Sequence, residues 1–185
     1  DRVLLNPAAI ETRPPNFGER FKPGKYDVYM LGNVDAAAFT KEELGELKAT
    51  VSKGAGLIML GGLRSFGPGG YAETPLADVL PITMGRFERQ TADAPTPKDL
   101  HLAGPLRIRP TPQGLNYCCR LAPTASESAA IWDRLPALSE GANKFAGLKP
   151  SAIVLAASDR KEPLLVAHAF GDGRVLAFAG DSTWH

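Results

Sequence analysis

The residues whose types and spacing could hold a ligand gather in a glycine-rich segment, Gly61 to Tyr71. This segment follows an apolar run, Leu57 to Leu60, typical of a buried parallel strand that ends at a ligand-binding edge of an α/β sheet. The backbone amides of such a loop could hold an anion, with Arg64 and Ser65 assisting. We therefore predict a ligand site composed of Gly61, Gly62, Arg64, Ser65, Gly67, Gly69, Gly70 and Asp181.

Each part of this predicted site has a structural alternative. The glycines could serve only to permit tight turns over the sheet edge, while Phe66 and Tyr71 pack into the core. The loop is neither a Walker A loop nor a dinucleotide fingerprint, because it lacks a Gly-Lys-Ser/Thr ending and its glycine spacing differs. Asp181 follows a strand-like run, so its carboxylate could line a cleft or cap the next turn.

Nucleophilic catalysis is predicted to be absent. It would need a serine or cysteine on a sharp strand-to-helix turn, and neither Gly-x-Ser-x-Gly nor Gly-x-Cys-x-Gly occurs. His168 lies in a strand-like run, where we expect a packed, hydrogen-bonded imidazole rather than a base. Cys118 and Cys119 are adjacent and form neither a CxxC motif nor a disulfide framework. The alternative is a hydrolase that uses Ser65 or Cys119 with His168.

The composition argues against several classes of cofactor and partner. Three scattered histidines and two adjacent cysteines match no metal-ligand spacing, and no motif predicts any other cofactor. A formal net charge of +1, with acidic and basic residues mixed, gives no electrostatic footprint for nucleic acid. No apolar segment approaches the roughly 18 to 20 residues that cross a bilayer, so we expect this segment to be soluble and not inserted in a membrane.

A strand–helix–strand unit is expected to position the glycine loop. Residues 26–31 are predicted to form its first strand. Thr40 and Glu43 then form a capping-box pattern, and apolar residues at helical spacing follow up to Gly54, where a C′ glycine would end the helix. The second strand begins at Leu57, so its far end delivers the loop to the sheet edge.

The middle of the chain is less regular. Thr74-Pro75 predicts the start of a short helix that Pro81 ends. Proline then recurs through residues 86–125, which we interpret as an irregular insertion containing one short strand at Leu106–Arg109. Residues 126–135 are expected to be helical.

The end of the chain is clearer. Residues 151–157 are predicted to form a buried strand, and 163–170 and 174–179, joined by Gly-Asp-Gly, a C-terminal β-hairpin. The length favours a single α/β domain over residues 1–185. Because both ends lack polar tails, we expect this domain to be part of a larger protein.

Several strings of the sequence resemble a known family. They are YDVYMLGNV, FTKEELGELKATVSKGAGLIMLGG, SFGPGGYAETPLADVLPI and PLLVAHAFGDGRVLAFAGDSTWH. The family is the class I glutamine amidotransferase-like domains of large envelope proteins in planctomycete-type bacteria. The resemblance implies a flavodoxin-like, three-layer α/β sandwich with a mostly parallel sheet, related to the trehalose-utilisation (ThuA-like) group.

The resemblance implies no catalytic residue. Active class I amidotransferases use a Cys–His–Glu triad, and this sequence has no match to the nucleophile motif. The leading hypothesis is therefore a non-catalytic binding or assembly module of a membrane-associated protein in the bacterial cell envelope. Its partners would be other domains of its own chain or other envelope proteins. The alternatives are the hydrolase above and a sugar- or anion-binding module.

Overall fold

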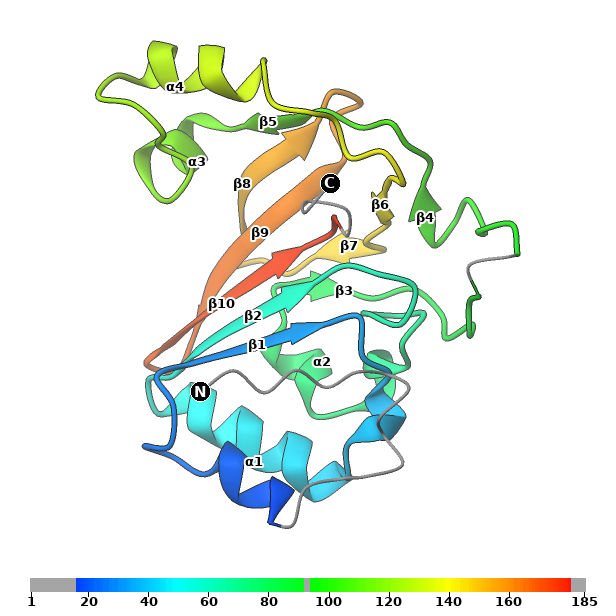
Figure 1. Ribbon diagram of the computed structural model, residues 1–185. Helices are drawn as coiled ribbons and strands as arrows, with labels where there is room; N and C mark the ends of the chain where they lie inside the picture. The colour runs from blue at the N-terminus through cyan, green and yellow to red at the C-terminus, as the bar shows by residue number, and fades with distance from the viewer. Residues whose placement is uncertain (1–15, 92–93, 181–185) are drawn as a thin grey trace.

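The computed structural model describes residues 16–91 and 94–180 (Figure 1). The strands of this part are β1 (Val28–Gly32), β2 (Gly56–Leu60), β3 (Ile82–Thr83), β4 (His101–Leu102), β5 (Ile108–Pro110), β6 (Ala142–Asn143), β7 (Gly147–Leu148), β8 (Ile153–Ser158), β9 (Pro163–Phe170) and β10 (Gly173–Phe178). Its α-helices are α1 (Lys41–Ser52), α2 (Leu76–Val79), α3 (Pro112–Asn116) and α4 (Ala125–Trp132). Short 3₁₀ helices occur at Phe17–Phe21, Ala36–Ala38 and Tyr71–Glu73.

A six-stranded mixed sheet lies at the centre of the molecule, in the order β1-β2-β10-β9-β8-β5 (Figure 1). β2 pairs in parallel with β1 on one side and with β10 on the other. The remaining neighbours, β10–β9, β9–β8 and β8–β5, pair antiparallel. Two further antiparallel pairs, β3–β7 and β4–β6, lie outside this sheet.

The predicted flavodoxin-like, three-layer sandwich with a mostly parallel sheet is therefore wrong. Parallel neighbours need a long crossover connection, usually a helix, whereas a short turn joins only antiparallel strands. The chain has such a helix, α1, between β1 and β2. Between β8, β9 and β10, in contrast, the chain has only the short segments 159–162 and 171–172, and these impose antiparallel pairing. The C-terminal hairpin, β9–β10, is observed where the glycine turn predicts it.

The β1–α1–β2 unit forms as predicted. The Thr40 hydroxyl accepts a hydrogen bond from the Glu43 amide at 3.2 Å, and the Glu43 carboxylate accepts one from the Thr40 amide at 2.8 Å. This capping box satisfies two amides that a helix start otherwise leaves unpaired. Leu44, Leu47 and Val51 are buried on one face of the helix. Burial of each stabilises the fold by about 1.5–3 kcal/mol.

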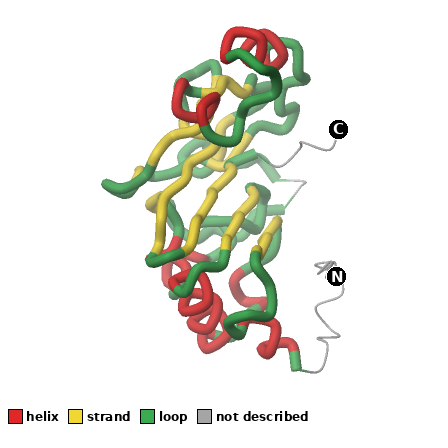
Figure 2. Tube along the Cα trace, turned by 90° about the vertical axis from the view of Figure 1, so that its left-hand side faces the viewer, coloured by secondary structure: helices red, strands yellow, loops and turns green. Residues whose placement is uncertain are grey.

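The helices lie in two groups, below and above the row of strands in Figure 2. α1 and α2 belong to the main core, together with inward residues of the sheet such as Leu57, Met59 and Val175. α3 and α4 lie near the other end of the sheet, against β8 and β5 (Figure 1). The sheet thus has its main core on the α1 face.

The predicted irregular insertion, residues 86–125, is more structured than expected. It contains β4, β5 and the short helix α3. Thr111 caps α3 by accepting a hydrogen bond from the Gly114 amide at 3.0 Å, and Pro112 occupies its first turn. The helix expected at 126–135 runs from Ala125 to Trp132. The expectation of one domain over residues 1–185 stays a prediction.

Candidate functional site

The glycine loop begins where three parallel strands end together. Gly32 and Phe178 are both register partners of Leu60, so β1, β2 and β10 terminate at the same edge of the sheet. The loop therefore lies at the sheet edge that the sequence predicts for it. Its internal contacts show what its glycines do there.

Close backbone approaches account for the glycines. A Cβ atom on Gly61 would lie 2.0 Å from the carbonyl oxygen of Ala179, and one on Gly69 would lie 2.1 Å from that of Arg64. Neither distance is compatible with a side chain unless the backbone moves. A positive φ or a backbone neighbour constrains the remaining loop glycines of the predicted site as well: Gly62, Gly67 and Gly70.

The amides of the loop are largely used within the protein. The Ser65 and Gly69 amides donate to the carbonyls of Gly62 and Ser65, at 3.2 and 3.1 Å. The Gly70 amide donates to the Gly67 carbonyl at 2.9 Å. A loop can hold an anion only with amides that point at it without another partner. This arrangement favours the structural alternative for the glycines over the predicted anion cradle.

The polar side chains of the loop region connect it to the end of β1. The Ser65 hydroxyl, almost fully buried, accepts a hydrogen bond from the backbone amide of Asn33 at 3.1 Å. The Asn33 side chain in turn accepts from the Arg64 amide at 3.0 Å. The Arg64 side chain itself is exposed. The remaining predicted site residue, Asp181, lies outside the described residues.

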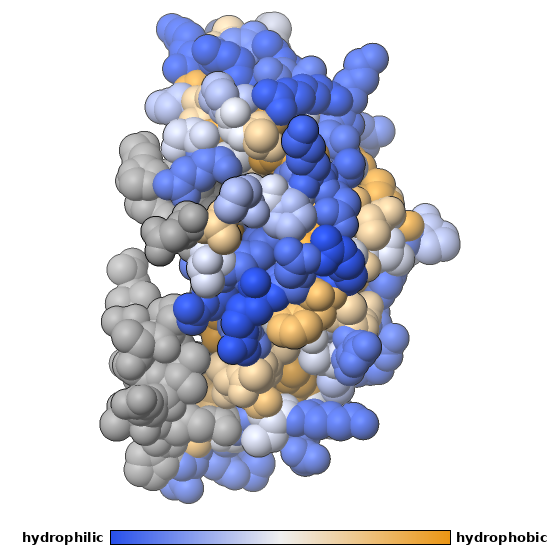
Figure 3. Space-filling view, turned by 90° about the vertical axis from the view of Figure 1, so that its right-hand side faces the viewer, coloured by the Kyte–Doolittle hydropathy of each residue, from blue (hydrophilic) through white to orange (hydrophobic). Residues whose placement is uncertain are grey.

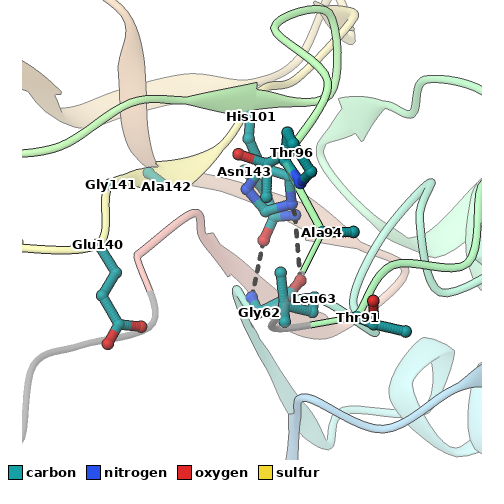
Figure 4. Close-up of a pocket in the computed structure, with 11 residues that line it drawn as sticks. Gly62, Leu63, Thr91, Ala94, Thr96, His101, Glu140, Gly141, Ala142 and Asn143 are labelled. Carbon is teal, nitrogen blue, oxygen red and sulfur yellow. Dashed lines mark hydrogen bonds between the residues drawn. The ribbon is translucent and has the colours of Figure 1, made fainter.

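A buried amide, Asn143, links the loop to β6 (Figure 4). Its Oδ1 accepts a hydrogen bond from the Gly62 amide at 2.8 Å, and its Nδ2 donates to the Gly62 carbonyl at 3.2 Å. Only 1% of Asn143 is exposed. One side chain therefore forms hydrogen bonds with both backbone polar groups of Gly62. Without Asn143 the buried Gly62 amide would lose this partner, whereas the Gly62 carbonyl also accepts a hydrogen bond from the Ser65 amide.

His101 is the second polar group at this junction. Because β4 and β6 pair His101 with Asn143, the imidazole Nε2 lies 3.4 Å from the Asn143 Nδ2. The amide nitrogen is a donor, so Nε2 accepts and the ring is neutral. Burial lowers the pKa of His101, while a hydrogen bond to the Ala142 backbone opposes that change. The ring is therefore uncharged at neutral pH.

A cavity of about 480 Å³ opens beside this junction. Its polar side chains are those of Thr91, Thr96, His101, Glu140 and Asn143 (Figure 4). Glu140 and Thr91 stand at opposite sides of that view, with Gly62 and Asn143 between them. Its other lining residues are Gly62, Leu63, Ala94, Pro95, Gly141 and Ala142.

The polar groups of the cavity lining include one acidic side chain. The lining holds one carboxylate, hydroxyls, an amide and a neutral imidazole, and no lysine or arginine among the described residues. The side of the molecule that carries β4 is mostly hydrophilic, with separate hydrophobic areas (Figure 3). Such a lining can donate to and accept from hydroxyl groups, but it offers no counter-charge to an anion.

The residues of the predicted hydrolase alternative are not brought together. The His168 Nε2 donates to the Val79 carbonyl at 2.5 Å, and its Nδ1 lies 3.3 Å from the Ser151 hydroxyl. Burial lowers its pKa. Its two ring nitrogens therefore already have partners, and neither partner is Ser65 or Cys119. Burial also raises the pKa of Cys119 to about 12, which disfavours the thiolate that a nucleophile requires.

The sequence pattern predicts the sheet edge at which the loop lies. It does not predict the side chains that line the cavity beside the loop. No sequence pattern points to His101, Glu140 or Asn143 as site residues. The cavity residues come from three distant segments. The β4–β6 pair brings two of them together, and the hydrogen bonds of Asn143 to Gly62 join the loop to that pair. No group of three or more metal-binding side chains occurs among the described residues.

Comparisons with known proteins show the fold only. No profile of a protein family and no curated protein sequence matches the chain. The cytoplasmic protein STM1381 from Salmonella typhimurium LT2 is similar in structure, with a TM-score of 0.65 and 24% identity, over 96% of this chain and 69% of that one. The cytoplasmic protein STM3548 from Salmonella typhimurium is also similar, with a TM-score of 0.69 and 20% identity, over 96% of this chain and 68% of that one. A β-galactosidase from Rahnella sp. R3 matches at a TM-score of 0.50 and 14% identity, over 84% of this chain and 20% of that one.

These findings correct the sequence-based assignment of the family. The resemblance to glutamine amidotransferase-like domains is wrong, because the similar structures are STM1381- and STM3548-type proteins and the sheet is mixed. The strings that carried it are local signals for one βαβ unit and a hairpin, which many folds share. In the described part of the chain, no helix is long and apolar enough to span a bilayer.

Proposed function

We propose that this chain is a non-catalytic binding module that takes a small, neutral, hydroxyl-rich molecule of the sugar class. The ligand would occupy the cavity between Gly62 and the β4–β6 pair. The supporting observation is the lining itself, in which a carboxylate, two threonine hydroxyls and a neutral imidazole surround a space of about 480 Å³. A space of this size lies within the range that small-molecule sites occupy.

The same lining argues against an anionic ligand. The Glu140 carboxylate would repel an anion, and no lining cation of the described residues would offset that repulsion. Five loop amides that could otherwise replace a cation already donate to Asn143, to Asn33 or to loop carbonyls; they are those of Gly62, Arg64, Ser65, Gly69 and Gly70. A sugar hydroxyl, in contrast, donates to a carboxylate and forms a charge-assisted hydrogen bond.

The lining also argues for binding rather than acyl transfer. No serine or cysteine of the described residues lines the cavity, and the His101 Nε2 has the Asn143 side chain as its partner rather than a hydroxyl that it could activate as a nucleophile. His101 accepts a hydrogen bond from Asn143, and its role in this proposal is to hold the ligand's orientation. An assembly role stays a prediction. Attachment to the bacterial envelope was implied by the family resemblance, which is wrong, and no observation supports it.

The test is a titration of the protein with glucose, galactose and mannose and, separately, with sulfate, followed by amide NMR shifts. We expect a saturable response to at least one sugar, centred on Thr96, His101 and Glu140. The Glu140→Ala variant should weaken binding about tenfold, since a hydrogen bond to a charged group contributes ~1.5 kcal/mol. Glu46→Ala, on the exposed face of α1, is the matched control and should bind as the parent does.

Two results would contradict the proposal. The first is no saturable shift with any of the sugars. The second is saturation by sulfate at the same residues, because that outcome requires a cationic or amide-lined site.

A further inference from the structure

A second cavity lies on the sheet face opposite α1. In the β9–β10 pair, Arg174 lies opposite Ala169 and Leu176 lies opposite Ala167. In the β8–β9 pair, Ile153 lies opposite Ala167. Side chains of paired residues share a face of a sheet, so these five form one surface. The alternating residues, such as Val175 and Ala177, belong to the main core on the other face.

α3 supplies the second wall of this cavity. The helix packs so closely on β8 that a Cβ atom on Gly114 would lie 1.9 Å from the Leu155 carbonyl oxygen. The cavity beside it has a volume of about 610 Å³. Its apolar lining includes Ile153, Leu155, Ala167 and Leu176, while α3 and the residue after it add Gln113, Asn116 and Tyr117.

Arg174 is the one charged residue that lines this cavity among the described residues. Its side chain is exposed, and one guanidinium nitrogen donates to the carbonyls of Asp172 and Gly173 at 3.3 and 3.1 Å. None of the ion pairs found in the described part of the chain includes Arg174. A guanidinium keeps its charge at all physiological pH values and binds carboxylates through two parallel hydrogen bonds.

We propose that this cavity binds a free medium-chain fatty acid. The carboxylate pairs with Arg174, and the hydrocarbon chain lies on the apolar surface of Ile153, Ala167 and Leu176. The charge of Arg174 selects the carboxylate over a neutral or cationic headgroup. The apolar surface supplies affinity, because each buried methylene contributes about 0.8 kcal/mol.

A neighbouring cavity on the same face provides an internal comparison. It has a volume of about 590 Å³ and includes Trp132, Leu138, Leu165 and Phe178 in its lining, with no charged side chain among the described residues. Hydrophobicity alone would direct an alkyl chain to either cavity. Selection by Arg174 directs only a carboxylate to the first.

The experiment compares decanoate, 1-decanol and decyltrimethylammonium by calorimetry and amide NMR. The two ions are kept below their micelle concentrations and the alcohol below its solubility limit. We expect decanoate to bind at least tenfold more tightly than the other two, with shifts at Ile153, Ala167 and Leu176. Arg174→Gln should remove this preference. Arg160→Gln is the matched control, because Arg160 also donates to two backbone carbonyls at the surface, and it should keep the preference.

A second variant tests the cavity independently of charge. Ala167→Leu fills apolar space beside Leu176 and should weaken decanoate binding, while thermal unfolding reports whether the variant is folded. The proposal is overturned if the three ligands bind equally, if the shifts centre on Trp132 and Phe178, or if no ligand binds. Binding to anionic lipid vesicles without binding to monomeric decanoate would also overturn it.

Discussion

The glycine loop and the cavity beside it lie at the same edge of the sheet and differ in what their polar groups do. In the loop, the amides of Gly62, Ser65 and Gly69 all have partners within the protein. In the cavity, the side chains of Glu140 and Thr96 line open space. The glycine-rich segment at this strand end thus allows close backbone packing. The space that a ligand could occupy is lined by polar side chains from distant segments.

This comparison predicts a separation of effects. Changes in the loop should alter the free energy of unfolding and leave ligand affinity unchanged when the protein is folded. Changes at Glu140 should alter affinity and leave stability unchanged. Asn143 belongs to both regions, because it bonds Gly62 and lines the cavity, so its substitution should affect both quantities.

The largest loss of stability is expected for Gly61→Ala. The new methyl group would lie 2.0 Å from the Ala179 carbonyl oxygen, so the backbone must shift, at a cost of about 3 kcal/mol. Urea unfolding would measure it. Gly45→Ala in α1 is the control, since nothing lies within 4 Å of its new Cβ and alanine favours a helix by about 0.5–1 kcal/mol. Equal stability of the two variants would show that the loop tolerates a side chain.

Asn143→Leu is expected to cost about 2 kcal/mol, because it removes the partner of the buried Gly62 amide and one of the two hydrogen bonds to the Gly62 carbonyl. It should also weaken sugar binding at the cavity. Asn116→Leu, at the exposed end of α3, is the control and should unfold like the parent. If Asn143→Leu unfolds like that control, Asn143 does not hold the loop in place.

Ser65→Ala should cost about 1 kcal/mol, since one hydrogen bond from the Asn33 amide is lost. Ligand affinity should not change, because Ser65 is buried within the loop and does not line the cavity. Unfolding and titration of the same preparation measure both. Ser126→Ala, near the exposed start of α4, is the comparison for stability. A change in affinity without a change in stability would return Ser65 to the candidate site.

Local signals in the sequence predict local structure well. The Thr40–Glu43 capping box and the glycine turn at 171–173 both form where expected. The Thr-Pro signal that predicts α2 at residues 74–75 also occurs at 111–112, where it starts the unpredicted helix α3. The signal occurs a third time at Thr96-Pro97, where no helix follows. Consistent use of it in the proline-rich segment would therefore have found α3 together with one false helix.

The sheet and the cavity depend on contacts between distant residues, and no local signal reports those. The lengths of the connections around β8, β9 and β10 set their antiparallel pairing, which the family resemblance obscured. His101 and Asn143 are 42 residues apart and meet only through the β4–β6 pair. Each strand of that pair has two residues, too few for an alternating pattern to be read from the sequence.

The smallest expected effect is the pH dependence that His101 confers. Burial lowers its folded-state pKa below the usual value of 6.5, so below that value the unfolded chain binds more protons than the folded one. Stability should therefore be highest above pH 6.5 and should decrease as the pH falls, because unfolding then takes up a proton. His168, whose pKa burial also lowers, contributes in the same direction. His101→Gln should reduce the slope of the unfolding free energy between pH 7 and pH 5 without abolishing it, because His168 still contributes. An unchanged slope in urea unfolding would mean that the imidazole is not held neutral beside Asn143, and that the cavity can carry a positive charge.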